Sequence, residues 1–113
     1  MLNKKNRLTK EEFDIVFKNG FSKSSEYFHI KILETKNSDK KFGVAVSKKI
    51  IKGAIKRHLL KRRVYSIIRN SLENIPNGVF IIFFLKKEGS SINFKETEKD
   101  IKNIINNILS SKK

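Results

Sequence analysis

The 113-residue sequence contains no cysteine, a single proline and no long apolar run. Without cysteine it can form neither disulfides nor thiolate metal sites, and its redox compartment is left open. The longest apolar run, residues 79–85, is far shorter than the roughly 20 residues that a membrane-spanning helix needs. The first residues show no apolar stretch of the signal-peptide kind. The sequence therefore favours a soluble, cytoplasmic protein with one domain over 1–113, frayed at 1–6 and 110–113.

Acidic residues are also scarce, with 11 against 26 lysines and arginines, for a net charge of +15. None lies in residues 40–72, whereas ten lysines and arginines fall in residues 40–63. A block of one sign repels itself unless a polyanion lies against it, and phosphate backbones are the commonest polyanion. A genome-wide bias could explain scattered lysines, but four of the five arginines lie within residues 57–69. The charge therefore favours a nucleic-acid binder.

Local patterns predict helices and strands in the order α-β-β-α-β-α. Thr9-Lys10-Glu11-Glu12 is a capping box that begins the first helix, and Asn19-Gly20 ends it. Asn93 can cap the last helix, whose apolar stripe contains Ile101, Ile104, Ile105 and Ile108. The remaining predicted elements are strands 27–33 and 42–47, paired antiparallel, a helix over 54–72 and a strand over 79–85 that is covered on both faces. This order predicts an α+β fold with a mixed sheet packed with helices.

The predicted strands have two unlike faces. Alternation places Phe28, Ile30 and Ile32 on one side of the first strand, and Tyr27, His29 and Lys31 on the other. In the second strand, Phe42, Val44 and Val46 alternate with Gly43, Ala45 and Ser47. The sheet should therefore have one apolar face and one face of small residues beside His29 and Lys31.

The predicted helix over 54–72 is apolar on one side and basic on the other. Its stripe contains Leu60, Val64, Ile67 and Ile68, widened by Ile55, Leu59 and Leu72. The other side carries a row spaced four apart, Arg57, Lys61 and Tyr65, with His58 and Arg62 beside it. A merely solvated helix face usually mixes charge signs, and guanidinium groups suit phosphates and stacked bases. Ser47-Lys48-Lys49, Lys52 and Lys56 extend the same basic surface.

Phe13 and Phe17 fit two interpretations. Aromatic residues at helical spacing are usually part of a core. They can also form a stacking platform for single-stranded bases, provided that the sheet does not fully cover the helix.

Residues that could carry chemistry are few. His29 and His58 lie on different elements without a metal-ligand spacing. The carboxylates cluster at helix starts, where capping and the helix dipole explain them, and they supply no obvious set for a two-metal nuclease. The residues predict a binding protein with no active site and no metal site of its own.

Two adjacent segments resemble the signature of a known family. Residues Phe42-Gly-Val-Ala-Val-Ser-Lys-Lys49, followed by Ala54-Ile-Lys-Arg-His-Leu-Leu-Lys-Arg62, are similar to the strand "V-G-(hydrophobic)-x-V-S-K-K" and the helix "R-N-R-(hydrophobic)-K-R" of the bacterial ribonuclease P protein subunit. Residues 6–20 resemble the opening segment of that family, and 78–85 with the last helix lie where the family has its final strand and helix. The resemblance covers nearly the whole chain in order.

The resemblance implies a fold of the ribosomal protein S5 domain 2-like type with a left-handed βαβ crossover, whereas about 98% of crossovers are right-handed. It also implies an endoribonuclease that works as a ribonucleoprotein and removes the 5′ leader from precursor tRNA. The catalytic RNA subunit, with Mg²⁺, would do the chemistry. The partners would be that RNA and precursor tRNA, with no membrane, and the protein alone is expected to be monomeric.

The resemblance also implies two binding surfaces. It points to Arg57, Lys61 and Arg62 as contacts to the RNA subunit, and the charge pattern adds neighbouring residues, namely Lys48, Lys49, Lys52, Lys56, His58, Arg63 and Tyr65. The family's leader cleft, between the first helix and the sheet, carries over to Phe13, Phe17, His29, Lys31 and Ala45. Three positions depart from the family. His58 replaces an asparagine, Leu59 replaces the second arginine, and Lys31 stands where relatives often have an aromatic residue, which favours a phosphate contact there.

Two alternatives stay open from the residues. A structural ribosomal protein would share the size and charge but would need no leader cleft. A DNA-binding module or independent nuclease is disfavoured by the poor supply of carboxylates.

Overall fold

A computed structural model describes residues 3–36, 38–91 and 93–111, with side chains up to 107. Its order is α1 (Lys10–Asn19), β1 (Phe21–Ser24), β2 (Phe28–Glu34), β3 (Lys40–Ala45), α2 (Ala54–Asn70), β4 (Val79–Leu85) and α3 (Phe94–Ser111). Single turns of 3-10 helix cover Lys4–Asn6, Leu72–Asn74 and Lys87–Gly89. The α+β class is confirmed. No helix in this described part of the chain is long and apolar enough to cross a membrane.

The four strands form one mixed sheet in the order β1-β2-β4-β3. The predicted antiparallel pairing of 27–33 with 42–47 is wrong, because β4 lies between them, antiparallel to β2 and parallel to β3. β4 is apolar on both faces, and a central position gives it neighbours along both edges. Strand β1 was not predicted. It has four residues and is mostly exposed, so its sequence carries little alternation.

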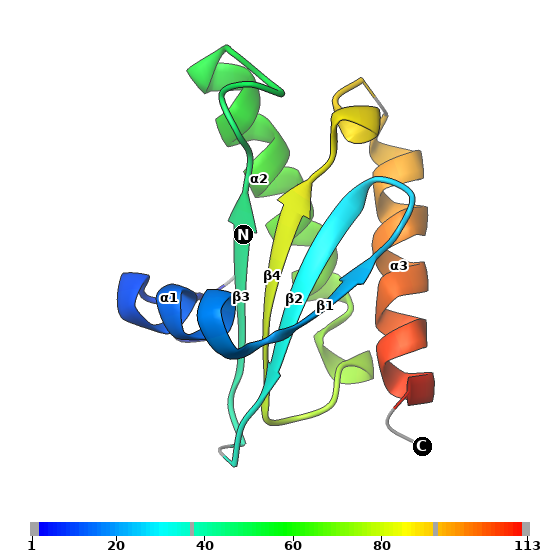
Figure 1. Cartoon of the computed structure of the whole chain (residues 1–113). Helices are drawn as coiled ribbons and strands as arrows, with labels where there is room; N and C mark the ends of the chain where they lie inside the picture. The colour runs from blue at the N-terminus through cyan, green and yellow to red at the C-terminus, as the bar shows by residue number, and fades with distance from the viewer. Residues whose placement is uncertain (1–2, 37, 92, 112–113) are drawn as a thin grey trace.

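Helices α2 and α3 cover one face of the sheet, and α1 crosses the other (Figure 1). The predicted alternation is confirmed within β2, since Phe28, Ile30 and Ile32 are buried while His29 is exposed. The expectation that Tyr27 shares the face of His29 is wrong: Tyr27 precedes β2, packs against the core beneath α2 and α3, and donates a hydrogen bond from its hydroxyl to Glu96 of α3. The core beneath α2 and α3 includes the predicted α2 stripe, Leu60, Val64, Ile67 and Ile68. In α3, Ile101, Ile104 and Ile105 are buried as predicted; the side chain of Ile108 lies outside the described residues.

The prediction that Ile55 and Leu59 widen the α2 stripe is wrong, because they are 78% and 53% exposed. The first turns of α2 project beyond the ends of the strands, so no sheet lies beneath them (Figure 1). Leu72, the third residue of that group, does pack against the core.

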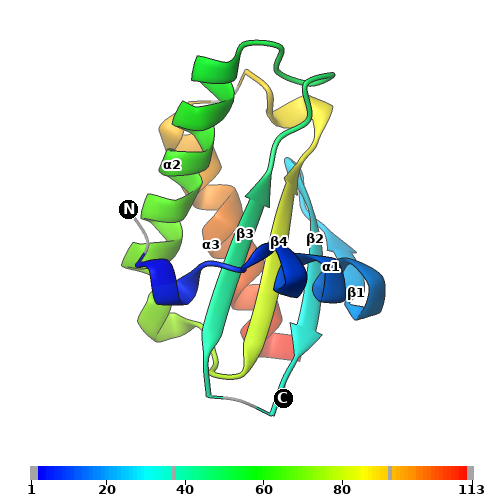
Figure 2. The same cartoon turned by 90° about the vertical axis from the view of Figure 1, so that its left-hand side faces the viewer.

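The β3–α2–β4 crossover has the left-handed sense that the family resemblance implies. In Figure 2, α1 lies in front of the sheet, both parallel strands run upward, and β4 is to the right of β3. Because α2 packs on the far face, the chain turns left-handed from one strand to the next. Most crossovers have the opposite hand.

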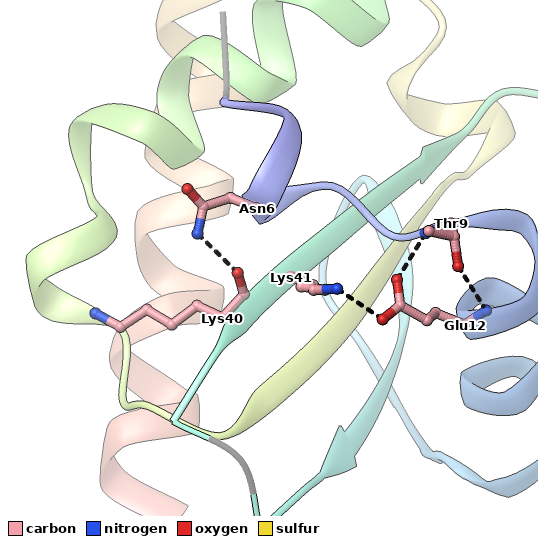
Figure 3. A network of polar contacts seen from close by, with 5 residues as sticks. All are labelled: Asn6, Thr9, Glu12, Lys40 and Lys41. Atoms are coloured by element: carbon pink, nitrogen blue, oxygen red, sulfur yellow. Dashed lines mark hydrogen bonds and ion pairs between the residues drawn. The ribbon is translucent and has the colours of Figure 1, made fainter.

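Helix α1 is fixed at its start by the predicted capping box. The Glu12 amide donates to Thr9 Oγ1 at 3.2 Å, and the Thr9 amide donates to Glu12 Oε1 at 2.9 Å. The second Glu12 oxygen lies 2.7 Å from Lys41 Nζ on β3, a contact drawn in Figure 3. Burial alone would raise the pKa of Glu12, but the hydrogen bonds from Lys41 and Thr9 outweigh it and hold that pKa below its usual value.

The N-terminal segment runs along the outer edge of β3. The Asn6 side-chain amide donates to the Lys40 carbonyl at 2.9 Å (Figure 3). The Leu8 amide donates to the Phe42 carbonyl at 2.9 Å. The fraying expected for residues 1–6 and 110–113 stays a prediction; of these, 1–2 and 112–113 lie outside the described residues.

Candidate nucleic-acid interface

The loop between β3 and α2 is a compact turn that presents lysines. The amides of Ile50 and Ile51 both donate to the Ser47 carbonyl, at 3.1 and 3.0 Å, and the Lys49 amide donates to Ser47 Oγ at 3.0 Å. This turn leaves the side chains of Lys48, Lys49 and Lys52 exposed. Cations on a fixed turn need little reordering when an anion binds.

Arg57 closes the same loop. Its Nη1 donates to the carbonyl of Ile51 at 3.0 Å and to that of Lys52 at 2.7 Å. The guanidinium therefore holds the loop against the first turn of α2. Arg57 was predicted to contact RNA; the structure adds that it shapes the segment which carries Lys52.

The predicted basic row does not form a single exposed surface. Arg57, Lys61 and Tyr65 are all only partly exposed, and the Tyr65 hydroxyl accepts a hydrogen bond from the Val44 amide of β3 at 3.2 Å. Burial raises the pKa of Tyr65, so its phenol stays neutral. The exposed members of the α2 set are instead Lys56, His58 and Arg62. We call these three, with Lys48, Lys49 and Lys52, the basic surface.

On the opposite face, strand pairing brings four side chains into one row. Ser24 pairs with His29, His29 with Phe84, and Phe84 with Ala45, so the row crosses all four strands. The alternation rule puts these side chains on the α1 face. The predicted leader residues His29 and Ala45 are thus brought together, two strands apart, with Phe84 between them.

Helix α1 covers the neighbouring part of this face and leaves that row partly open. Val16 packs on Phe80 and Ile82 in a small buried cluster. Phe13 and Phe17 both meet Phe84 edge-to-face, each with ring centroids 6.0 Å apart. Phe13 is partly buried in the cluster, whereas Phe17 is 51% exposed. Phe13 therefore fits the interpretation as a packing residue, and Phe17 keeps an exposed ring on which a base could stack.

A groove of about 370 Å³ lies beside Phe17, lined by Phe17, Ser22, Lys23, Ser24, His29, Ile30, Lys31 and Phe84. Lys31 Nζ donates to the Phe17 carbonyl at 3.0 Å and lies 5.2 Å from the centre of the Phe17 ring. His29 Nδ1 lies 2.9 Å from Ser24 Oγ. The groove thus combines two phenylalanine rings, an imidazole and two lysines. We call it the aromatic groove; Phe13 and Ala45 border it without lining it.

Phe84 is the functional candidate that the sequence alone did not supply. It lies in the continuous apolar run 79–85, where every residue looks equally buried. Counting parity from Phe83, which faces the core, would place Phe84 on the other face. This assignment requires knowing that Phe83 faces the core, and the uniformly apolar sequence of residues 79–85 does not indicate which residues do.

These features define a class of protein: a small, strongly basic α+β fold with a surface of exposed cations on α2 and the loop before it, and a groove with aromatic rings on the α1 face of its sheet. In the part of the chain that the structure describes, no group of three or more His, Cys, Asp or Glu side chains could hold a metal ion.

Comparisons with known proteins narrow that class. The family model described as Ribonuclease P matches residues 2–109. The ribonuclease P protein component of Pseudanabaena sp. is 34% identical over 107 residues, covering 93% of this chain and 92% of the relative. The one from Clostridioides difficile is 34% identical over 95 residues, covering 83% and 82%. The chain therefore belongs to the ribonuclease P protein family.

Solved structures agree with this assignment. The RNase P protein from Thermotoga maritima matches with a TM-score of 0.80 at 28% identity, covering 88% of this chain and 94% of the other. The Staphylococcus aureus RNase P protein also gives 0.80, at 18% identity and with coverage of 89% and 93%, which supports the fold alone.

Proposed function

We propose that this chain is the protein subunit of a ribonuclease P ribonucleoprotein, and that it binds both the catalytic RNA subunit and the 5′ leader of precursor tRNA. The observation that carries the proposal is that the chain presents two unlike surfaces, the basic surface on α2 with the loop before it and the aromatic groove on the α1 face of the sheet. The basic surface is suited to a folded RNA, and the aromatic groove is suited to a single strand.

The basic surface holds the RNA subunit through phosphates. This surface includes Arg62 and borders the partly exposed Arg57, Lys61 and Arg63. The sequence from residue 40 to residue 72 contains no acidic residue that could neutralise these cations locally. Neutralising RNA phosphates releases counterions, so affinity should fall steeply with salt. The chain then lowers repulsion between the two RNAs at their junction.

The aromatic groove holds the leader. An unpaired base can stack on the exposed ring of Phe17, and Phe84 with His29 continues the surface across the sheet. Lys31, anchored at the C-terminal end of α1, supplies a cation for a leader phosphate. Binding several leader nucleotides favours the precursor over the mature tRNA.

The chemistry itself belongs to the RNA subunit with Mg²⁺, and the protein contributes position and charge. By holding substrate phosphates in place, it lowers the Mg²⁺ concentration that cleavage requires. The protein acts in the cytoplasm, as a monomer when alone.

Reconstitution tests the proposal. A transcript of the RNA subunit is assayed for precursor cleavage at low Mg²⁺, with and without the protein. We expect cleavage only when both are present. Cleavage by the protein alone, or no rescue of the RNA, would refute the proposal.

Leader binding has a matched pair of variants on α1. Phe17 and Ile15 are 51% and 50% exposed, and only Phe17 lines the groove. Phe17→Ala should weaken binding of precursor tRNA by about 1–3 kcal/mol and leave mature tRNA unchanged. Ile15→Ala should affect neither. Equal losses for both tRNAs would indicate a packing role, and a structural ribosomal protein would show no leader preference at all.

A further inference from the structure

A second groove, of about 440 Å³, lies between the outer side of α2 and the start of α3. It is lined by Leu59, Arg62, Arg63, Ser66 and Phe94. Two of these are large apolar side chains that stay exposed, Leu59 at 53% and Phe94 at 42%. Neither contributes to the core, and the basic surface as defined above does not include them.

The groove pairs an aromatic ring with guanidinium groups. Arg63 Cζ lies 5.6 Å from the centre of the Phe94 ring, and Arg62 lines the same space. All the charged side chains that line it are cationic. Its lining therefore combines apolar and planar side chains with groups that attract anions.

Phe94 is held firmly in this place. The Asn93 carbonyl accepts from the Thr97 amide at 3.1 Å and from Thr97 Oγ1 at 2.9 Å, and Asn93 Oδ1 accepts from the Glu96 amide at 2.9 Å. Thr97 is fully buried. These bonds fix the backbone at the start of α3, from which the Phe94 side chain projects, so a ligand needs little backbone reordering there.

The mixture of apolar and cationic groups limits which class of ligand fits the groove. A bare phosphate run would make no use of the apolar surface of Leu59 and Phe94. An apolar peptide would leave Arg62 and Arg63 against uncharged surface. A nucleotide with an unpaired base satisfies both, because its base can stack on a ring or a guanidinium plane while its phosphate pairs with arginine.

Leu59 strengthens this argument. Its apolar side chain lines the groove and is 53% exposed. It offers no charge to a phosphate at that point and favours contact with a base.

We propose that this groove binds one unpaired nucleotide of the RNA subunit, with its base against Phe94 and Leu59 and its phosphate at Arg62 or Arg63. The inference rests on the proposed function, since it names a contact within the RNA-binding role.

The first test measures binding of the RNA-subunit transcript across a salt series. Phe94→Ala should weaken binding about 5- to 150-fold, the loss typical of one stacked base, with the salt dependence unchanged. Arg62→Ala should weaken binding and lower the salt slope by about one. Ile55→Ala is the control, because Ile55 is also an exposed large apolar side chain, lies on α2 as Arg62 does, and is outside the groove. Urea unfolding checks that each variant folds.

The outcomes separate the two claims. If the natural sequence does not bind the transcript, the proposed function fails. If it binds and Phe94→Ala behaves like Ile55→Ala, this inference fails and the proposed function stands.

A photo-crosslinker at position 59 gives a second readout on the assembled complex with precursor tRNA. Crosslinking to an unpaired nucleotide of the RNA subunit is expected. Crosslinking to a paired region, to the precursor or to another protein would overturn the inference.

Discussion

One face of the sheet is closed by α2 and α3, whereas the other is only partly covered by α1 (Figures 1 and 2). Beneath α2 and α3 the strands contribute Phe28, Phe42 and Phe83, all without exposed surface. On the α1 side, the buried cluster consists of Val16, Phe80 and Ile82, and the row through His29 and Phe84 stays accessible. The closed face holds the strands together through its buried side chains, and the open face uses the register of the strands to align accessible side chains, which the proposed function assigns to RNA binding.

The contrast is sharpest at two consecutive phenylalanines. Phe83 is fully buried and meets Phe28 edge-to-face at 6.0 Å. Phe84, one residue later, meets Phe17 and lines the aromatic groove. Two identical side chains that are adjacent in the chain thus have different surroundings, one in the core and one at the groove, because side chains alternate along a strand.

The largest effect should come from the closed face. Phe83→Ala removes a fully buried ring and should lower the free energy of unfolding by about 3–5 kcal/mol, measured by urea denaturation. A loss as small as that of an exposed residue would mean that the α2/α3 face is not the main source of stability.

Phe84→Ala should affect tRNA binding more than stability. Loss of stacking should reduce affinity for leader-bearing tRNA by about 1–3 kcal/mol, while the free energy of unfolding falls much less than for Phe83→Ala. Comparing unfolding and tRNA binding for both variants tests the division directly. If Phe84→Ala destabilised the protein as much as Phe83→Ala, the open face would be a core and not a binding surface.

Much of the fold could be predicted from local sequence. The capping box at Thr9, the alternation around Ile30 and the stripe through Val64 each depend on neighbours a few residues away, and the structure confirms them. The position of β4 between β2 and β3 could not be predicted, because it depends on pairing between distant segments. The family resemblance supplied the crossover hand, which general rules would have given wrongly.

The candidate site was predictable to a similar degree. His29, Lys31 and Phe17 gather at one groove, as expected. Phe84 was missed because its face is set by tertiary pairing, and Tyr65 proved to cap a strand amide, which no charge pattern indicates. The exposure of Leu59 was missed because the stripe continues in sequence beyond the point where the sheet ends in space.

A smaller effect should follow from crowding the contact between α1 and the sheet. A Cβ on Gly43 would lie 3.2 Å from Phe13 Cδ2 and 3.3 Å from Leu8 Cδ1, so Gly43 allows α1 to approach β3 closely. Gly43→Ala should cost about 1 kcal/mol of unfolding free energy, the lower end for overpacking. Adding Leu8→Ala should relieve part of that cost, giving a non-additive double variant. Simple additivity of the two losses would argue against a steric origin.

The smallest effect should come from the charge that ties α1 to β3. Glu12→Gln keeps the capping box, which accepts either residue at this position, and removes the carboxylate from Lys41. Because the pair is partly solvated, with side chains 20% and 24% exposed, we expect a loss of only about 0.2–1 kcal/mol at neutral pH.

The pKa of Glu12 is lower in the folded protein than its usual value of 4.5, so this contribution is present above pH 4.5 and disappears as the pH falls through the folded-state pKa. Urea unfolding of both proteins at pH 7 and at a series of acidic pH values should therefore show a gap that narrows as the pH falls, and Lys41→Met should narrow it in the same way at pH 7. A gap that stayed constant with pH would mean that Glu12 fixes α1 through packing and capping alone.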